Sequence, residues 1–214
     1  MRPIVKICGL MRPEDVSLCL REGADLIGFV VEYPHPVPWN LSVEEAQRCM
    51  AVAPAARACV VTSGAPDKVL RIARETGAGY IQLHGDETPT EAAYLVQELG
   101  KRGVKVIKAI FPGRPGLLEQ QARAFCEAGV FALLFDPRTP DNAAEGGAAD
   151  LAAFRKLQQA VTCPVILAGH LTPENAADLV ARSGAPMIDV MSGVETAPGV
   201  KDQAKLHALL ESFT

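Results

Sequence analysis

Short runs of β-branched residues alternate eight times along this chain with longer stretches rich in Ala, Leu, Glu and Arg. This alternation is typical of βα units that build a parallel sheet. Strands are expected over residues 4–8, 25–31, 58–62, 79–83, 105–110, 132–136, 165–168 and 187–191. Eight evenly spaced units favour a closed (β/α)8 TIM barrel over the competing fold, a doubly wound open sheet.

One domain over residues 1–214 is the expected organisation, because barrels of this kind often have about this length. The hydrophobic content of 49% is enough for a large core. Caps, prolines or acids predict helix starts near residues 12–15, 42–45, 88–91 and 172–175. Long loops are expected at 33–39 and 141–150, and loops that follow strands form the active-site face of a barrel.

The charge balance argues against a nucleic-acid partner. Lys and Arg total 21 against 25 Asp and Glu, the net charge is -4, and no basic cluster is present. No apolar run approaches the length of a membrane span, and the first residues do not resemble a signal peptide. We therefore expect a cytoplasmic protein without a membrane partner.

The cysteines are scattered, without a Cys-x-x-Cys pair or a histidine at metal-ligand spacing. Free thiols and no metal site are therefore expected. The six are Cys8, Cys19, Cys49, Cys59, Cys126 and Cys163.

Two strand ends carry candidates for acid–base chemistry. Cys8 ends the first strand before Gly9, and a thiolate there can abstract a proton if positive charge lowers its pKa; an inert thiol is the equal alternative. Asp136 follows an apolar strand, which suits a general acid that keeps its proton near neutrality. Its alternative role is to cap the loop through the amides of Arg138 or Thr139.

The last two strands predict a phosphate site. Gly169 and His170 follow the seventh strand, and Ser192 and Gly193 follow the eighth. Barrels commonly bind phosphate at these loops through backbone amides. Tight turns would use the same glycines, so neither glycine is decisive by itself.

The fourth strand ends in a polar cluster. Gln82 and His84 are positioned to face a ligand, although a lone histidine more often caps a helix or bonds a neighbouring loop. Asp189, inside the eighth strand, is expected to be buried with a partner and to serve the structure.

A set of short motifs recurs in order from residue 4 to residue 202. They are Lys6-Ile7-Cys8-Gly9-Leu10, Arg12-Pro13-Glu14-Asp15, Gly23-Ala24-Asp25, Gly28-Phe29-Val30, Gln82-Leu83-His84-Gly85, Asp136 with Thr139-Pro140, Leu167-Ala168-Gly169, Asp189-Val190, Ser192-Gly193-Val194-Glu195 and Gly199-Val200-Lys201-Asp202. As an ordered set they resemble the phosphoribosylanthranilate isomerase family of tryptophan biosynthesis.

The resemblance implies a (β/α)8 barrel that performs an Amadori rearrangement on a small phosphorylated sugar substrate, without metal or organic cofactor. It implies that Cys8 is the base and Asp136 the acid. The oligomeric state stays open between monomer and homodimer.

Departures from the family pattern lie in the binding loops. The family usually shows Ser-Pro-Arg-x-Val after the second strand, whereas Trp39 stands in place of the Arg here. Trp39 can stack on an aromatic ring or fill space but cannot pair with a carboxylate, so Arg12 or Arg138 is a candidate replacement. His170 replaces the family's second Gly, and Met191 replaces a Ser. The family's Gly-Gly-Thr-Gly corresponds to residues 146–149, Gly-Gly-Ala-Ala.

Three functions follow, in this order of preference. The first is a phosphoribosylanthranilate isomerase with an unusual substrate clamp. The second is a paralogue that isomerises another N-ribosyl phosphate, which the missing Arg favours. The third is a non-catalytic barrel that binds a sugar phosphate, which the presence of both Cys8 and Asp136 argues against.

Overall fold

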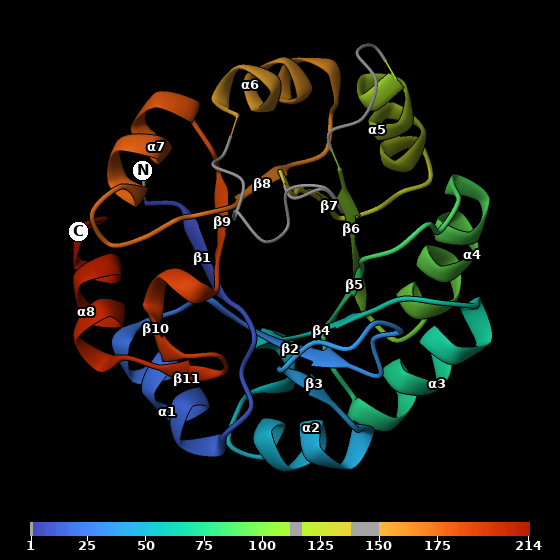
Figure 1. Cartoon of the computed structure of the whole chain (residues 1–214). Coiled ribbons are helices and arrows are strands. Elements are labelled where there is room, and N and C mark those ends of the chain that lie inside the picture. The colour runs from blue at the N-terminus through green and yellow to red at the C-terminus, as the bar shows by residue number, and fades with distance from the viewer. Residues whose placement is uncertain (1, 112–116, 138–149) are drawn as a thin grey trace.

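A computed structural model of the chain describes residues 2–111, 117–137 and 150–214. Its strands are β1 (Ile4–Ile7), β2 (Leu26–Val31), β3 (Asn40–Leu41), β4 (Ala58–Thr62), β5 (Tyr80–Leu83), β6 (Lys105–Ile110), β7 (Ala132–Phe135), β8 (Val165–Ala168), β9 (Met187–Val190), β10 (Glu195–Ala197) and β11 (Val200–Lys201). The sheet closes because β1 pairs in parallel with both β2 and β9. Figure 1 shows the resulting barrel inside a ring of helices, which confirms the predicted (β/α)8 fold.

The helices alternate with the barrel strands along the chain. They are α1 (Pro13–Glu22), α2 (Val43–Met50), α3 (Pro66–Thr76), α4 (Pro89–Gly100), α5 (Leu117–Glu127), α6 (Leu151–Ala160), α7 (Ala176–Ser183) and α8 (Gln203–Glu211). Capping boxes led by Ser42 and Thr88 satisfy the first amides of α2 and α4. Within the described residues, none of these helices is long and apolar enough to cross a membrane.

The predicted strand ranges match the barrel strands to within one residue at each end. One helix start differs, because α7 begins at Ala176 rather than near Pro173. Asn175 accepts a hydrogen bond from the Thr172 amide at 2.8 Å and donates to the His170 carbonyl at 2.8 Å, which holds the preceding residues in a turn. The short strands β3, β10 and β11 were not predicted, since two or three residues carry too little periodicity.

Apolar side chains pack on both the inner and the outer face of the barrel strands. One cluster lies inside the barrel and includes Ile107, Leu134 and Ile166, while a larger one packs the outer strand faces against the helices. Phe135 of β7 meets Phe154 of α6 in that outer layer with ring centroids 6.1 Å apart. Strands buried on both faces read as continuous apolar runs, which is why they were readily found in the sequence.

The expectation of six free thiols is wrong for two cysteines. Cys126, near the end of α5, forms a disulfide with Cys163, just before β8, with Cα atoms 5.8 Å apart. These residues are 37 positions apart in the sequence and meet because α5 and α6 are neighbours around the barrel. Spacing along the chain carries no signal for such a pair. The other four cysteines are free, as expected, and all four are buried.

Candidate active site

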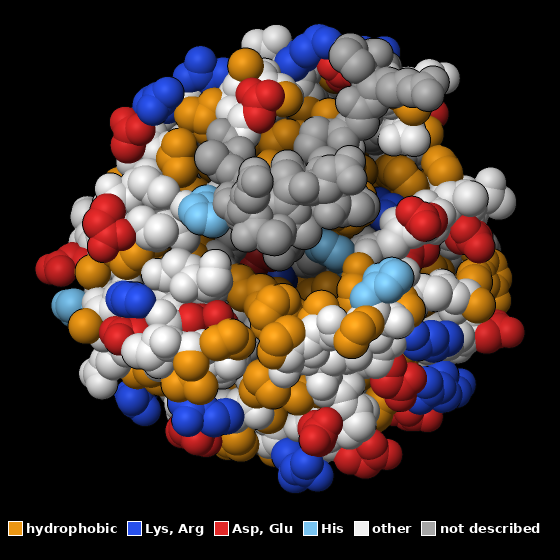
Figure 2. All heavy atoms as spheres, viewed as in Figure 1, with side chains coloured by type: hydrophobic (Ala, Val, Ile, Leu, Met, Phe, Trp, Pro, Cys, Tyr) orange, Lys and Arg blue, Asp and Glu red, His pale blue; other side chains and the backbone are white. Residues whose placement is uncertain are grey.

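A cavity of about 520 Å³ opens at the carboxyl ends of the barrel strands. The side of the barrel seen in Figure 2 carries histidine and hydrophobic side chains around its centre. Most of the predicted site residues line this one cavity: Cys8, Trp39, Gln82, His84, Asp136, Gly169, His170, Ser192 and Gly193. Strands far apart in the sequence thus deliver their terminal residues to a common space, as expected for a barrel.

Cys8 lies directly after β1, where its amide donates to the Val190 carbonyl at 2.9 Å. Its side chain is 6% exposed and reaches the cavity. Burial raises the pKa of the Cys8 thiol above its ordinary value, and the positive charge of Lys6 works against that rise. The thiol therefore faces the cavity as a protonated group unless nearby charge stabilises its thiolate.

A buried ion pair lies beside Cys8, formed by two residues that the sequence analysis did not pair. Lys6 Nζ donates to Asp189 Oδ2 at 2.9 Å, and the Lys6 side chain has no exposed surface. Asp189 was expected to be buried with a partner; it has the partner, but it is only partly buried and also lines the cavity. The available signal was a lysine two residues before Cys8 in an apolar strand, because alternate residues share a face.

Asp136 occupies the opposite side of the mouth, after β7, with 1% of its surface exposed. His84 Nε2 lies 3.4 Å from Asp136 Oδ2, and Gln82 Nε2 lies 3.2 Å from His84 Nδ1. If the Gln82 amide donates to Nδ1, the neutral imidazole carries its hydrogen on Nε2 and donates to Asp136. This arrangement suits a carboxyl that gives up a proton and must then be stabilised as a carboxylate.

Aromatic rings form a wall on the same side of the cavity. The His84 ring meets Phe111 edge-on at 5.3 Å and Tyr33 at 6.1 Å between centroids. The Tyr33 hydroxyl donates to the His84 carbonyl at 2.9 Å. Trp39 also lines the cavity and packs against the apolar cluster that contains Cys8. Tyr33 and Phe111 were not predicted as site residues; each lies just after a strand, which was the available signal. Such a wall can accommodate a planar ring of a ligand.

Two tight loops border the remaining side. Gly169 has φ 98° and the exposed His170 has φ 53°, a left-handed conformation that favours glycine. Ser192 and Gly193 lie in a short 3-10 turn (Ser192–Val194), and a Cβ on Gly193 would collide with the Leu171 carbonyl. The His170 backbone thus holds a left-handed conformation at some cost in strain.

Of the two arginines considered as replacements for the family's Arg, the structure describes Arg12 alone. Arg12 forms a two-pronged ion pair with Asp15 at 2.8 and 2.9 Å and does not line the cavity. Arg138 lies outside the described residues. Among the described lining residues, none is Lys or Arg. No cluster of His, Cys, Asp or Glu suited to a metal ion occurs in the described parts of the chain.

The fold and the cavity define a class: a (β/α)8 barrel with candidate acid and base groups at the carboxyl ends of its strands. The family model described as "PRAI: N-(5'phosphoribosyl)anthranilate (PRA) isomerase" matches residues 5–212. The chain belongs to this family, which agrees with the resemblance noted in the sequence.

Relatives of known sequence and structure support this assignment. An N-(5'-phosphoribosyl)anthranilate isomerase of Halobacterium salinarum is 35% identical over 216 residues, covering 98% of this chain and 95% of the relative. The phosphoribosyl anthranilate isomerase of Thermus thermophilus is 33% identical, covers 99% of this chain and 98% of its own, and superposes with a TM-score of 0.79. A third isomerase, 27% identical with coverage of 99% and 98% and a TM-score of 0.78, was solved with reduced 1-(o-carboxyphenylamino)-1-deoxyribulose 5-phosphate.

Proposed function

We propose that this protein converts N-(5'-phosphoribosyl)anthranilate into 1-(o-carboxyphenylamino)-1-deoxyribulose 5-phosphate, an Amadori rearrangement in tryptophan biosynthesis. The observation that carries the proposal is the family match over residues 5–212, with Cys8 and Asp136 on one cavity. A related isomerase binds a reduced form of this product. The family match favours this function over a paralogue with another substrate and over a non-catalytic barrel.

Asp136 acts as the general acid in this proposal. It protonates the furanose ring oxygen, the bond from that oxygen to C1' breaks, and the amine nitrogen supplies the electron pair that forms an iminium. The Asp136 carboxylate left behind accepts the hydrogen bond from His84 Nε2, 3.4 Å away in the resting site. A donor already in place lowers the cost of forming this charge.

Cys8 acts as the base. Its thiolate removes the C2' proton of the iminium, and the electrons of the C–H bond form the C1'–C2' double bond of an enolamine, which then tautomerises to the ketone. Because burial raises the pKa of Cys8, the active thiolate fraction increases with pH.

The rest of the cavity holds the two ends of the substrate. The loops with Gly169, His170, Ser192 and Gly193 are proposed to bind the phosphate through backbone amides and the His170 ring. Trp39 and the aromatic wall are proposed to hold the anthranilate ring, with Gln82 and His84 as further substrate contacts. Four expectations stay predictions: a single domain over residues 1–214, a cytoplasmic location, a monomer or homodimer, and the lack of a nucleic-acid partner.

A fluorescence assay tests the proposed function. Purified protein is mixed with freshly generated phosphoribosylanthranilate and coupled to the next enzyme, with Cys8→Ala assayed beside it. Turnover that disappears in Cys8→Ala is expected. Absence of turnover from a folded wild-type protein would instead point to another N-ribosyl phosphate as substrate.

A further inference from the structure

The proposed base presents a chemical problem that the acid does not. Cys8 must lose a proton to act, yet burial raises the pKa of its thiol. A buried thiolate needs a compensating positive charge within contact distance. The structure has two buried lysines around Cys8, and they meet different parts of it.

Lys6 meets the sulfur. It lies two residues before Cys8, so both side chains point into the barrel. A Cβ atom added to Gly28 would lie 2.7 Å from Cys8 Sγ and 3.1 Å from Lys6 Nζ, so the two groups converge over this glycine. Burial raises the pKa of Cys8, and the charge of the Lys6 ammonium is the first influence that lowers it.

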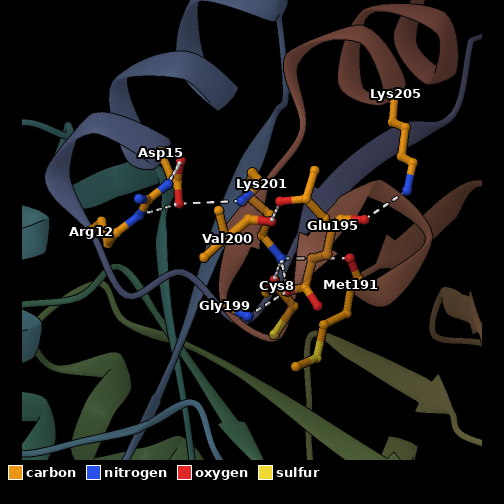
Figure 3. Close-up of polar contacts among 10 residues, drawn as sticks. Cys8, Arg12, Asp15, Met191, Glu195, Gly199, Val200, Lys201 and Lys205 are labelled. Atoms are coloured by element: carbon orange, nitrogen blue, oxygen red, sulfur yellow. Dashed lines mark hydrogen bonds and ion pairs between the residues drawn. The ribbon is translucent and has the colours of Figure 1, made fainter.

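Lys201 meets the backbone instead. Its Nζ donates to the Cys8 carbonyl at 2.5 Å and to Glu195 Oε1 at 2.6 Å (Figure 3). It also reaches the Met191 carbonyl at 3.5 Å. Lys201 therefore ties the ends of β1 and β9 together, and Glu195 neutralises its charge.

The other groups around the sulfur do not supply positive charge. Cys59 of β4 is a buried thiol whose pKa burial raises to about 12, so it stays neutral. Asp189 of β9 carries a negative charge that favours the ammonium of Lys6: burial lowers the pKa of Lys6, but the charge of Asp189 and its hydrogen bond to Lys6 work against burial, and the pKa is raised. Lys6 is thus held as a cation directly beside Cys8.

We propose that Lys6, fixed by Asp189, is a positioning residue that stabilises the thiolate form of Cys8 during catalysis. This inference rests on the proposed role of Cys8 as base. Lys6 keeps its proton throughout: the C2' proton passes to the sulfur and forms the S–H bond, and that proton leaves to solvent before the next turnover. Gly28 serves the same arrangement by leaving space for the sulfur and the ammonium to meet.

The test compares Lys6→Met and Lys6→Arg with the wild-type protein. Iodoacetamide alkylation of Cys8 is followed against pH by peptide mass spectrometry, beside the pH dependence of kcat/KM. Loss of the ammonium should move both profiles to higher pH by roughly one unit or more. In Lys6→Arg the shift should be smaller, because the guanidinium keeps the positive charge. The Kd for inorganic phosphate should stay within about threefold of the wild-type value, because a tenfold change in Kd needs a change of about 1.4 kcal/mol at the phosphate site itself.

Lys108→Met is the matched control. Lys108 is also a buried lysine with a carboxylate partner, Glu87 Oε2 at 3.1 Å, but it lies on the outer side of β6 over the Phe125 ring. Its loss should leave the alkylation profile of Cys8 unchanged. An equal shift in both variants would overturn the proposal, since any buried lysine would then have the same effect.

Lys6→Met leaves Asp189 without its partner, so this variant is also made together with Asp189→Asn to keep the site neutral. The alkylation profile of the double variant should still move upward. An unchanged profile in a folded single or double variant would overturn the role of Lys6. Alkylation needs no substrate, so failure of the proposed reaction in the wild-type protein would be seen separately.

Discussion

The two sides of the cavity mouth stabilise their reactive groups by different means. On the β1 and β9 side, buried ion pairs surround Cys8: Lys6 with Asp189 at 2.9 Å, and Lys201 with Glu195 at 2.6 Å. On the β5 and β7 side, Asp136 meets His84 at 3.4 Å, beside the aromatic wall.

The difference follows from what each group must do. A base has to be negative before the reaction, so cations are placed beside it in advance. An acid becomes negative only as it reacts, so a polar donor such as a neutral imidazole is sufficient. The two sides should therefore respond separately to substitution.

Asp136→Asn is expected to have the largest effect and to leave the base side intact. Turnover should fall roughly a thousandfold, because the proton donor for ring opening is lost. The alkylation profile of Cys8 should stay as in the wild-type protein. A matching change in the reactivity of Cys8 would show that the two sides are not separate.

Lys201→Met tests the base side through stability. Lys201 and Glu195 have side chains 0% and 7% exposed, so removing the cation leaves a buried carboxylate without its partner. The free energy of unfolding in urea should fall by about 3 kcal/mol. Lys205→Met, which removes only a bond from Lys205 to the Glu195 carbonyl, is the control and should cost less.

Gly28→Ala probes the meeting point of Lys6 and Cys8. The added methyl group would lie 2.7 Å from Cys8 Sγ, so the sulfur must move away from the ammonium. We expect kcat to fall roughly ten- to a hundredfold with little change in phosphate affinity. Unchanged kcat in a folded variant would show that the position of the sulfur is not critical.

His84→Ala weakens the acid side by removing the imidazole whose Nε2 lies 3.4 Å from Asp136 Oδ2. Turnover should fall about tenfold, the value of one hydrogen bond to a charged group. His84→Gln keeps an N–H donor and should retain more activity. Equal losses in the two variants would show that His84 contributes through its shape and not through its N–H group.

His170→Gly should have the smallest effect and should change neither the base side nor the acid side. Its backbone has φ 53°, so glycine relieves strain and should raise the free energy of unfolding by about 0.5 kcal/mol. His170→Ala keeps the strain and is the control. A gain with alanine as well would show that the imidazole rather than the backbone is destabilising.

The strands were predictable because runs such as Ala132–Phe135 are apolar and bounded by turn residues. The positions of Cys8 and Asp136 at strand ends then followed from the barrel itself. Both inferences depend only on local sequence and on one rule of architecture.

Pairings between distant residues were not predictable. Lys6 and Asp189 are 183 positions apart, and their contact depends on β1 pairing with β9. The disulfide of Cys126 and Cys163 has the same origin, since it depends on neighbouring helices. Arg12 shows the converse. Its place near a strand end made it a candidate for the site, but its guanidinium forms an ion pair with Asp15 instead.

A kinetic isotope effect with substrate deuterated at C2' tests the division of roles most directly. In Cys8→Ser a weaker base makes removal of the C2' proton slow, so a clear primary isotope effect on kcat is predicted. In Asp136→Asn ring opening becomes slow and precedes that step, so the isotope effect should vanish. Equal isotope effects in the two variants would contradict the assignment of base to Cys8 and acid to Asp136.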